Sequence, residues 1–75
     1  MSEKKRYLKN LIEMIRLNPI QSGAFVHHQQ NILSLALLTL EATEQIPDPA
    51  ANEARLSAAI ERCERFLKER NQGAA

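Results

Sequence analysis

The sequence predicts a small all-α protein of three helices. In three separate segments, apolar residues recur at spacings of three and four, which is the period of one helix face. Two stretches that contain proline, Asn18-Pro19 and Ile46-Pro47-Asp48-Pro49, divide these segments. The chain has 75 residues, and a domain of this size buries only about 60% of its unfolded surface. We therefore expect one all-helical domain over residues 1–75 that gains stability from a partner.

The first helix is expected over about residues 3–17, with Ser2 as its N-cap and Asn18-Pro19 as its end. At about 100° per residue, one broad face of this helix is apolar. That face carries Tyr7, Leu8, Leu11, Ile12, Met14 and Ile15. The opposite face is basic, and residues 1–20 hold five Lys and Arg against two Glu. This segment therefore supplies all of the protein's net positive charge.

The second helix is expected over about residues 23–45, with Ser22 as its N-cap, and it is apolar on two sides. The first seam runs through Val26, Gln29, Leu33, Ala36, Leu40 and Thr43, and is widened by Phe25, Ile32 and Leu37. The second seam runs through His28, Asn31, Leu35, Leu38 and Ala42. A helix that is apolar on two sides must be covered on two sides.

The third helix is expected over about residues 49–70, because Asp48 is a strong N-cap and Pro49 suits the first helical position. Its core stripe consists of Asn52, Leu56, Ala59, Cys63 and Phe66, widened by Ile60 and Leu67. Its outer face carries two i to i+4 ion pairs, Glu61 with Arg65 and Glu64 with Lys68. Residues 71–75 are expected to form a frayed tail.

Two architectures cover both seams of the second helix. In one, a monomeric bundle places this helix between the other two. In the other, the second and third helices form a long hairpin beside the shorter first helix, and the second seam pairs with another copy. The first helix is roughly two turns shorter than the second, so in an antiparallel arrangement it leaves the end near Leu38 and Ala42 poorly covered. We therefore expect a helical-bundle homodimer.

The sequence offers little for catalysis or metal binding. His27 and His28 are adjacent, so on a helix they point about 100° apart and cannot bind one metal ion together. Cys63, the only cysteine, lies in an apolar stripe and is typical of a core residue. Neither a Gly-rich phosphate loop nor a Ser nucleophile motif is present. We expect no enzyme activity, no metal ion, no cofactor and no small-molecule substrate.

His28 and Asn31 allow two interpretations. In the simpler one, His27 is solvated while His28 and Asn31 form a hydrogen-bonded polar end to the second seam. In the other, the same two residues fix the register of an interface, as buried polar residues do in coiled coils. Protonation of His28 at about pH 6 would then loosen that interface.

The candidate contacts to nucleic acid, or to an acidic partner, are the basic residues of the first helix. They are Lys4, Lys5, Arg6, Lys9 and Arg16. Tyr7 is the only aromatic residue near them, so no stacking platform is expected, and the charge-balanced third helix is not typical of a recognition helix. A small DNA- or RNA-binding regulator is therefore the alternative function. Binding of the first helix to a membrane surface is a weaker alternative, because this helix lacks Trp.

The function that remains is binding to another protein. We expect a non-enzymatic interaction module, a regulator or inhibitor that binds itself and a larger protein through helix faces. Small helical inhibitors encoded by phages and mobile elements are an analogy, and a structural or assembly subunit is the second alternative. A single cysteine, the lack of a cleavable signal pattern and the lack of about 18 successive apolar residues predict a cytoplasmic protein without a transmembrane segment.

Overall fold

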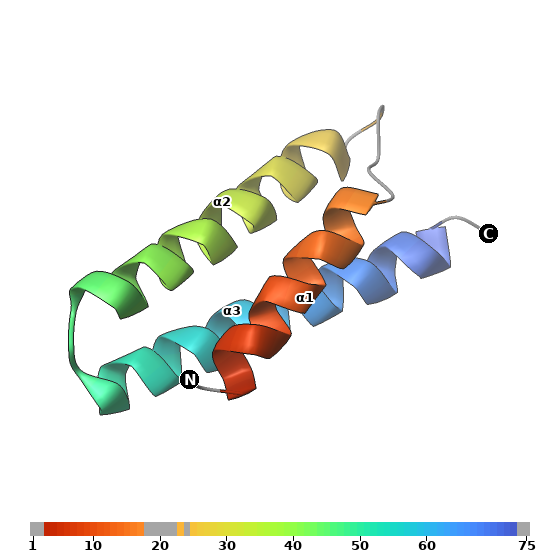
Figure 1. The fold of residues 1–75 in the computed structure, drawn as a ribbon. Coiled ribbons are helices and arrows are strands. Elements are labelled where there is room, and N and C mark those ends of the chain that lie inside the picture. Colours follow the sequence, from red (N-terminus) through yellow and green to blue (C-terminus); the bar gives the residue numbers. More distant parts are fainter. Residues whose placement is uncertain (1–2, 18–22, 24, 74–75) are drawn as a thin grey trace.

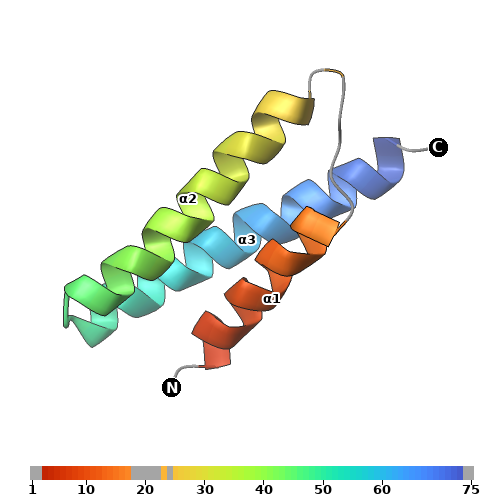
Figure 2. The same ribbon diagram turned by 45° about the horizontal axis from the view of Figure 1, so that its top comes forward.

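Three helices make up the computed structural model, which describes residues 3–17, 23 and 25–73 (Figure 1). They are α1 (Glu3–Leu17), α2 (Phe25–Gln45) and α3 (Pro49–Gly73). Within the described residues there is no strand, which confirms the predicted all-α class. α2 runs antiparallel to both of its neighbours, so α1 and α3 point the same way (Figures 1 and 2).

The helix bounds differ from the predicted ones at two ends. α2 begins at Phe25 instead of residue 23, because Gly23 has a φ of 89°, outside the right-handed helical region. α3 continues to Gly73, so the frayed tail predicted from residue 71 is wrong for the first three of its residues. The backbone stays helical through Asn71 because no proline follows Arg70 to interrupt it. The predicted caps Ser2 and Ser22 lie outside the described residues, as do residues 74–75.

The turn between α2 and α3 is held by polar groups at both helix ends. Asp48 Oδ1 accepts a hydrogen bond of 3.2 Å from the backbone N–H of Ala51, as predicted for the N-cap of α3. The side-chain amide of Asn52 donates to the carbonyl oxygens of Ile46 at 2.8 Å and Thr43 at 3.4 Å. Because these carbonyls lie at the C-terminal end of α2, the first turn of α3 caps the helix that precedes it.

The core lies where all three helices meet. Its most deeply buried large side chains are Phe66 and Cys63 from α3 and Leu8 and Ile15 from α1. The other buried apolar residues are Leu11, Ile12, Ile32, Ala36, Leu40, Leu56, Ala59 and Leu67. α1 lies against α3 more extensively than against α2. The apolar stripe predicted for α3 is therefore the common centre of the fold.

Three residues that the helical pattern placed on core faces are exposed instead. Tyr7 and Met14 are seven residues apart, so they share one edge of the α1 face, and both are exposed there. Leu37 widens the first seam of α2 but is 42% exposed. The number of apolar positions on a helix face overestimates how many of them are buried. A helix that contacts only one pair of neighbouring helices buries a narrow stripe of that face.

Candidate protein-interaction surface

The second seam of α2 lies open in this structure. Leu38 is 63% exposed and Leu35 is 36% exposed. His28 and Asn31 are exposed as well, and Ala42 is half-buried. The second seam is therefore open along Asn31, Leu35 and Leu38, whereas Ala42 is half-buried and His28 contacts Phe66 of α3.

The seam is open because of the side on which α1 packs, and the length of α1 is not the cause. Lys5 Nζ lies 3.1 Å from Glu44 Oε1, so the start of α1 reaches the last turn of α2. The end of α2 near Leu38 is poorly covered as expected, with Ala42 half-buried, but the short length of α1 is not the reason. Leu38 and Leu40 are two residues apart on α2, so at about 100° per residue their side chains point in directions roughly 200° apart. Because Leu40 is buried in the core, Leu38 points away from the core.

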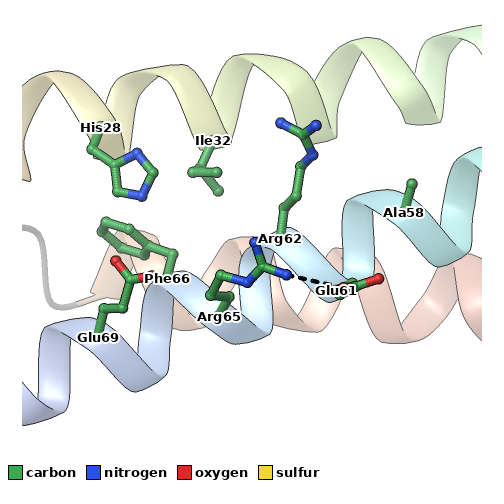
Figure 3. Close-up of a pocket in the computed structure, with 8 residues that line it drawn as sticks. All are labelled: His28, Ile32, Ala58, Glu61, Arg62, Arg65, Phe66 and Glu69. Atoms are coloured by element: carbon green, nitrogen blue, oxygen red, sulfur yellow. Dashed lines mark hydrogen bonds and ion pairs between the residues drawn. The ribbon is translucent and has the colours of Figure 1, made fainter.

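Beside the second seam, a groove runs between α2 and α3 (Figure 3). Its larger hollow, of about 490 Å³, is lined by His28, Ile32, Ala58, Glu61, Arg62, Arg65, Phe66 and Glu69. A smaller hollow of about 250 Å³ is lined by Leu35, Thr39, Arg55, Ala58, Ala59 and Arg62. The two hollows share Ala58 and Arg62, so they adjoin each other, and we call them together the α2/α3 groove.

The two walls of the α2/α3 groove differ in charge. The α2 wall has no Lys, Arg, Asp or Glu, and its residues lie at spacings of four and three: His28, Ile32, Leu35 and Thr39. On the mostly charged α3 wall, five of the eight lining residues follow the same spacing, Arg55, Ala58, Arg62, Arg65 and Glu69, and the others are Ala59, Glu61 and Phe66. This second stripe was missed in the sequence because it reads as the solvated side of α3. Its regular spacing is the signal that could have revealed it.

Three rings close the groove at the start of α2. The His28 ring centroid lies 5.3 Å from that of Phe66, and Phe25 lies 5.9 Å from His28 and 6.1 Å from Phe66. Figure 3 shows the His28 ring above Phe66. No hydrogen bond joins His28 to Asn31 within the described residues, so the predicted polar pair is not formed. His28 instead packs as an aromatic side chain.

Arg62 is set apart from the other arginines of the groove. Arg65 Nη2 lies 3.0 Å from Glu61 Oε1, which is one of the two ion pairs predicted on α3. Arg55 donates a hydrogen bond of 3.1 Å to Asn52. Arg62, which borders both hollows, has no hydrogen bond or ion pair within the described part of the chain. Figure 3 shows its side chain rising from α3 towards α2.

Ion pairs within the protein engage most of the basic residues predicted to meet nucleic acid. Lys4 Nζ lies 2.8 Å from Glu53 and donates a hydrogen bond of 2.8 Å to Ser57. Lys5 pairs with Glu44, and Arg16 lies 3.7 Å from Glu13. Among the described residues, only Arg6 and Lys9 of this set make no such contact. Two of the five cations therefore hold α1 to the hairpin.

Two further groups have pKa values moved from their usual range. Tyr7 donates a hydrogen bond of 2.6 Å to Glu64 Oε2, and this contact raises the pKa of the phenol. Glu64 is therefore bound to α1, whereas the sequence predicted a pair with Lys68. Burial raises the pKa of the Cys63 thiol to about 11, with a smaller effect from the Glu64 charge. A thiol that is neutral at physiological pH is a poor nucleophile.

The described residues form no metal-binding cluster and no membrane-spanning helix. Over residues 3–17, 23 and 25–73, no group of three or more His, Cys, Asp or Glu is placed to hold a metal ion. None of α1, α2 and α3, as far as they are described, has the length and apolar character needed to cross a membrane. Comparison with known protein families, curated proteins and solved structures gives no match to this chain.

Proposed function

We propose that this protein is a non-enzymatic interaction module, a small regulator or inhibitor that binds a larger protein through the α2/α3 groove and the adjoining second seam. The observation that carries the proposal is the exposure of Leu35 and Leu38 on the same face as the groove. Exposed leucines beside a concave surface are typical of sites that receive apolar side chains from a partner.

An interface of standard size would occupy a small share of this chain's surface. The accessible surface of the chain is 5196 Å², and a standard interface buries about 800 Å² on each partner, roughly 15% of that total. Burial of apolar surface contributes about 25 cal/mol per Å² before the costs of association are counted. A chain whose own core is small also gains stability from any partner that binds only its folded state.

A homodimer is the second way in which the same face is covered. Two copies would pair through the second seam and form a larger helical bundle, as the sequence analysis proposed. His28, Asn31, Leu35, Leu38 and Ala42 include no Lys, Arg, Asp or Glu, so self-pairing would bury none of these charges. Nucleic-acid binding has less support, because three of its five candidate cations already form ion pairs.

Site-specific crosslinking in the cells that make the protein tests the proposal. A photoreactive amino acid replaces Leu38 in one variant and Leu37 in a matched control, because both leucines are exposed on α2 but point about 100° apart. We expect a defined adduct with another polypeptide from position 38 and none, or much less, from position 37. Equal labelling from both positions, or no adduct from either, would contradict the proposed surface.

A further inference from the structure

The α2/α3 groove combines an apolar floor with an unmatched positive charge at its centre. Leu35 is 36% exposed and Ala58 is exposed, so both contribute apolar surface, whereas Ile32 is only 6% exposed and Phe66 has no exposed surface. Arg62 lies where the two hollows meet and has no hydrogen bond or ion pair within the described residues. An occupant that filled the groove with apolar atoms alone would remove water from this guanidinium without replacing its hydrogen bonds, which is costly. The favoured occupant therefore brings an acceptor, and a carboxylate is the strongest one.

The shape of the groove suits a helix. From Arg55 to Glu69, the α3 wall spans about 21 Å at 1.5 Å per residue. A third helix laid along two others presents side chains at spacings of three and four, the same spacing as the residues of both walls. An amphipathic helix of about 14 residues would cover the groove from end to end.

We propose that the groove binds an amphipathic helix of another protein, with a carboxylate on the partner placed to meet Arg62. This inference rests on the proposed function and specifies the partner's chemistry. The apolar stripe of the partner helix lies on Leu35 and Ala58, the exposed apolar residues of the groove. Its acidic residue, next to the stripe, makes a charge-assisted contact with Arg62, so binding discriminates between acidic and basic helices.

A second copy of this chain fits the groove less well. The face of α2 that a second copy would present is its second seam, and that seam carries no carboxylate. The acidic residues of α2 are Glu41 and Glu44, and Glu44 is already paired with Lys5. Glu41 is separated from Leu35 by about 120° around the helix, so it points away from a groove into which Leu35 of that copy is inserted. Charge complementarity therefore favours a different protein.

Three synthetic helices test the inference. Each is an alanine-rich peptide of about 18 residues with leucines spaced three and four apart, and they differ only in one residue beside the central leucine: Glu, Gln or Lys. Fluorescence anisotropy with the full-length protein, at constant ionic strength, gives the dissociation constants. We expect the Glu peptide to bind at least about tenfold more tightly than the Lys peptide, with the Gln peptide between them.

Charge reversal on the protein provides the decisive comparison. In Arg62→Glu, we expect the order of affinities to invert, so that the Lys peptide binds most tightly. Arg6→Glu is the matched control, because Arg6 is an exposed arginine of α1 with no partner among the described residues, and it should keep the wild-type order. Circular dichroism shows that each variant is folded. An order that stays the same in Arg62→Glu, or that inverts equally in Arg6→Glu, would overturn the inference.

The outcomes separate this inference from the proposed function. If all three peptides bind alike and Leu35→Glu abolishes binding, the groove is an apolar interaction site without acidic selectivity. In that case the inference fails and the proposed function stands. No binding of any peptide up to about 1 mM, together with a homodimer crosslinked at position 38, identifies a second copy as the occupant and overturns the inference. If no peptide binds and no crosslinked adduct forms at position 38, both the inference and the proposed function are rejected.

Discussion

Asn52 ties the first turn of α3 to the end of α2 through a hydrogen bond of 2.8 Å from its side-chain amide to the carbonyl oxygen of Ile46. The sequence pattern had placed Asn52 in the apolar stripe of α3, where an amide would be a weak core residue. The predicted position of Asn52 is correct, but its side-chain amide donates hydrogen bonds to backbone carbonyls that a helix end leaves without partners. The α2–α3 hairpin therefore depends on a contact that propensity and periodicity do not describe.

Replacement of Asn52 should weaken the fold through this cap. We expect Asn52→Asp to lower the free energy of unfolding by about 1–2 kcal/mol, because it removes the donor to the carbonyl of Ile46 and leaves that group without the bond. The aspartate keeps the acceptor that Arg55 uses. Arg55→Ala is the control for that second contact and should cost less than about 0.5 kcal/mol. Urea denaturation measures both, and equal losses would contradict the role of the cap.

Leu38 should contribute to association and not to the stability of the monomer. Because its side chain is 63% exposed, we expect Leu38→Glu to change the free energy of unfolding of the isolated chain by less than about 0.5 kcal/mol. If two copies pair through the second seam, the same change should make the protein monomeric in sedimentation equilibrium. Leu37→Glu, at a side chain that points about 100° away from Leu38 on α2, should leave the association state unchanged. A Leu38→Glu chain that fails to fold would show that this leucine belongs to the core.

The helix pattern predicted the core of α3 well, and the reason is local. Leu56, Ala59, Cys63 and Phe66 follow one helical period in a segment that has charged residues on its other sides. The cap at Asp48 was also predictable, because the proline that follows it fixes the backbone for a helix start. The apolar spacing and the cap are therefore each set by residues that lie close together in the sequence.

The location of the groove could not be predicted in the same way. Leu35 and Leu37 are the same residue type on the same helix, and only the side on which α1 packs distinguishes their surroundings. Arg62 reads in sequence as one of many solvated charges. It becomes part of a site only because its flank of α3 lies beside Ile32 and Leu35 of α2, a pairing between residues far apart in the chain.

Tyr7 offers a direct measurement of the contact between α1 and α3. It is the only tyrosine, and the chain has no tryptophan, so absorbance at about 295 nm during a pH titration reports this phenol alone. Its hydrogen bond to Glu64 raises its pKa, and we expect a midpoint above the ordinary value of about 10. Glu64→Ala should move the midpoint back towards that value, whereas Glu61→Ala, which removes the partner of Arg65 and not that of Tyr7, should not. If the midpoint were the same in Glu64→Ala as in the unchanged protein, the contact between Tyr7 and Glu64 would not be formed in solution.

Cys63 should make the fold sensitive to high pH. Its thiol has a folded-state pKa of about 11, raised above its ordinary value of about 9 by burial. Whether stability rises or falls with pH depends on whether the thiol ionises first in the folded or in the unfolded state. Below about pH 9 the thiol is protonated in both states, and its contribution to stability is fully present. Between about pH 9 and 11 the unfolded chain loses the proton while the folded chain keeps it, so stability falls by about 2–3 kcal/mol in total.

A matched pair of proteins isolates this effect from the other groups that titrate in the same range. Tyr7 also titrates at high pH, so the comparison is made between Tyr7→Phe and Tyr7→Phe/Cys63→Ala, which share every titratable group other than Cys63. The alanine variant should be less stable at pH 7 because it loses a buried sulfur atom. The difference between the two free energies of unfolding should then shrink or change sign as the pH rises from 8 to 11. A difference that stays constant would mean that the Cys63 thiol ionises as easily in the folded protein as in the unfolded chain, and that α1 does not keep water from it.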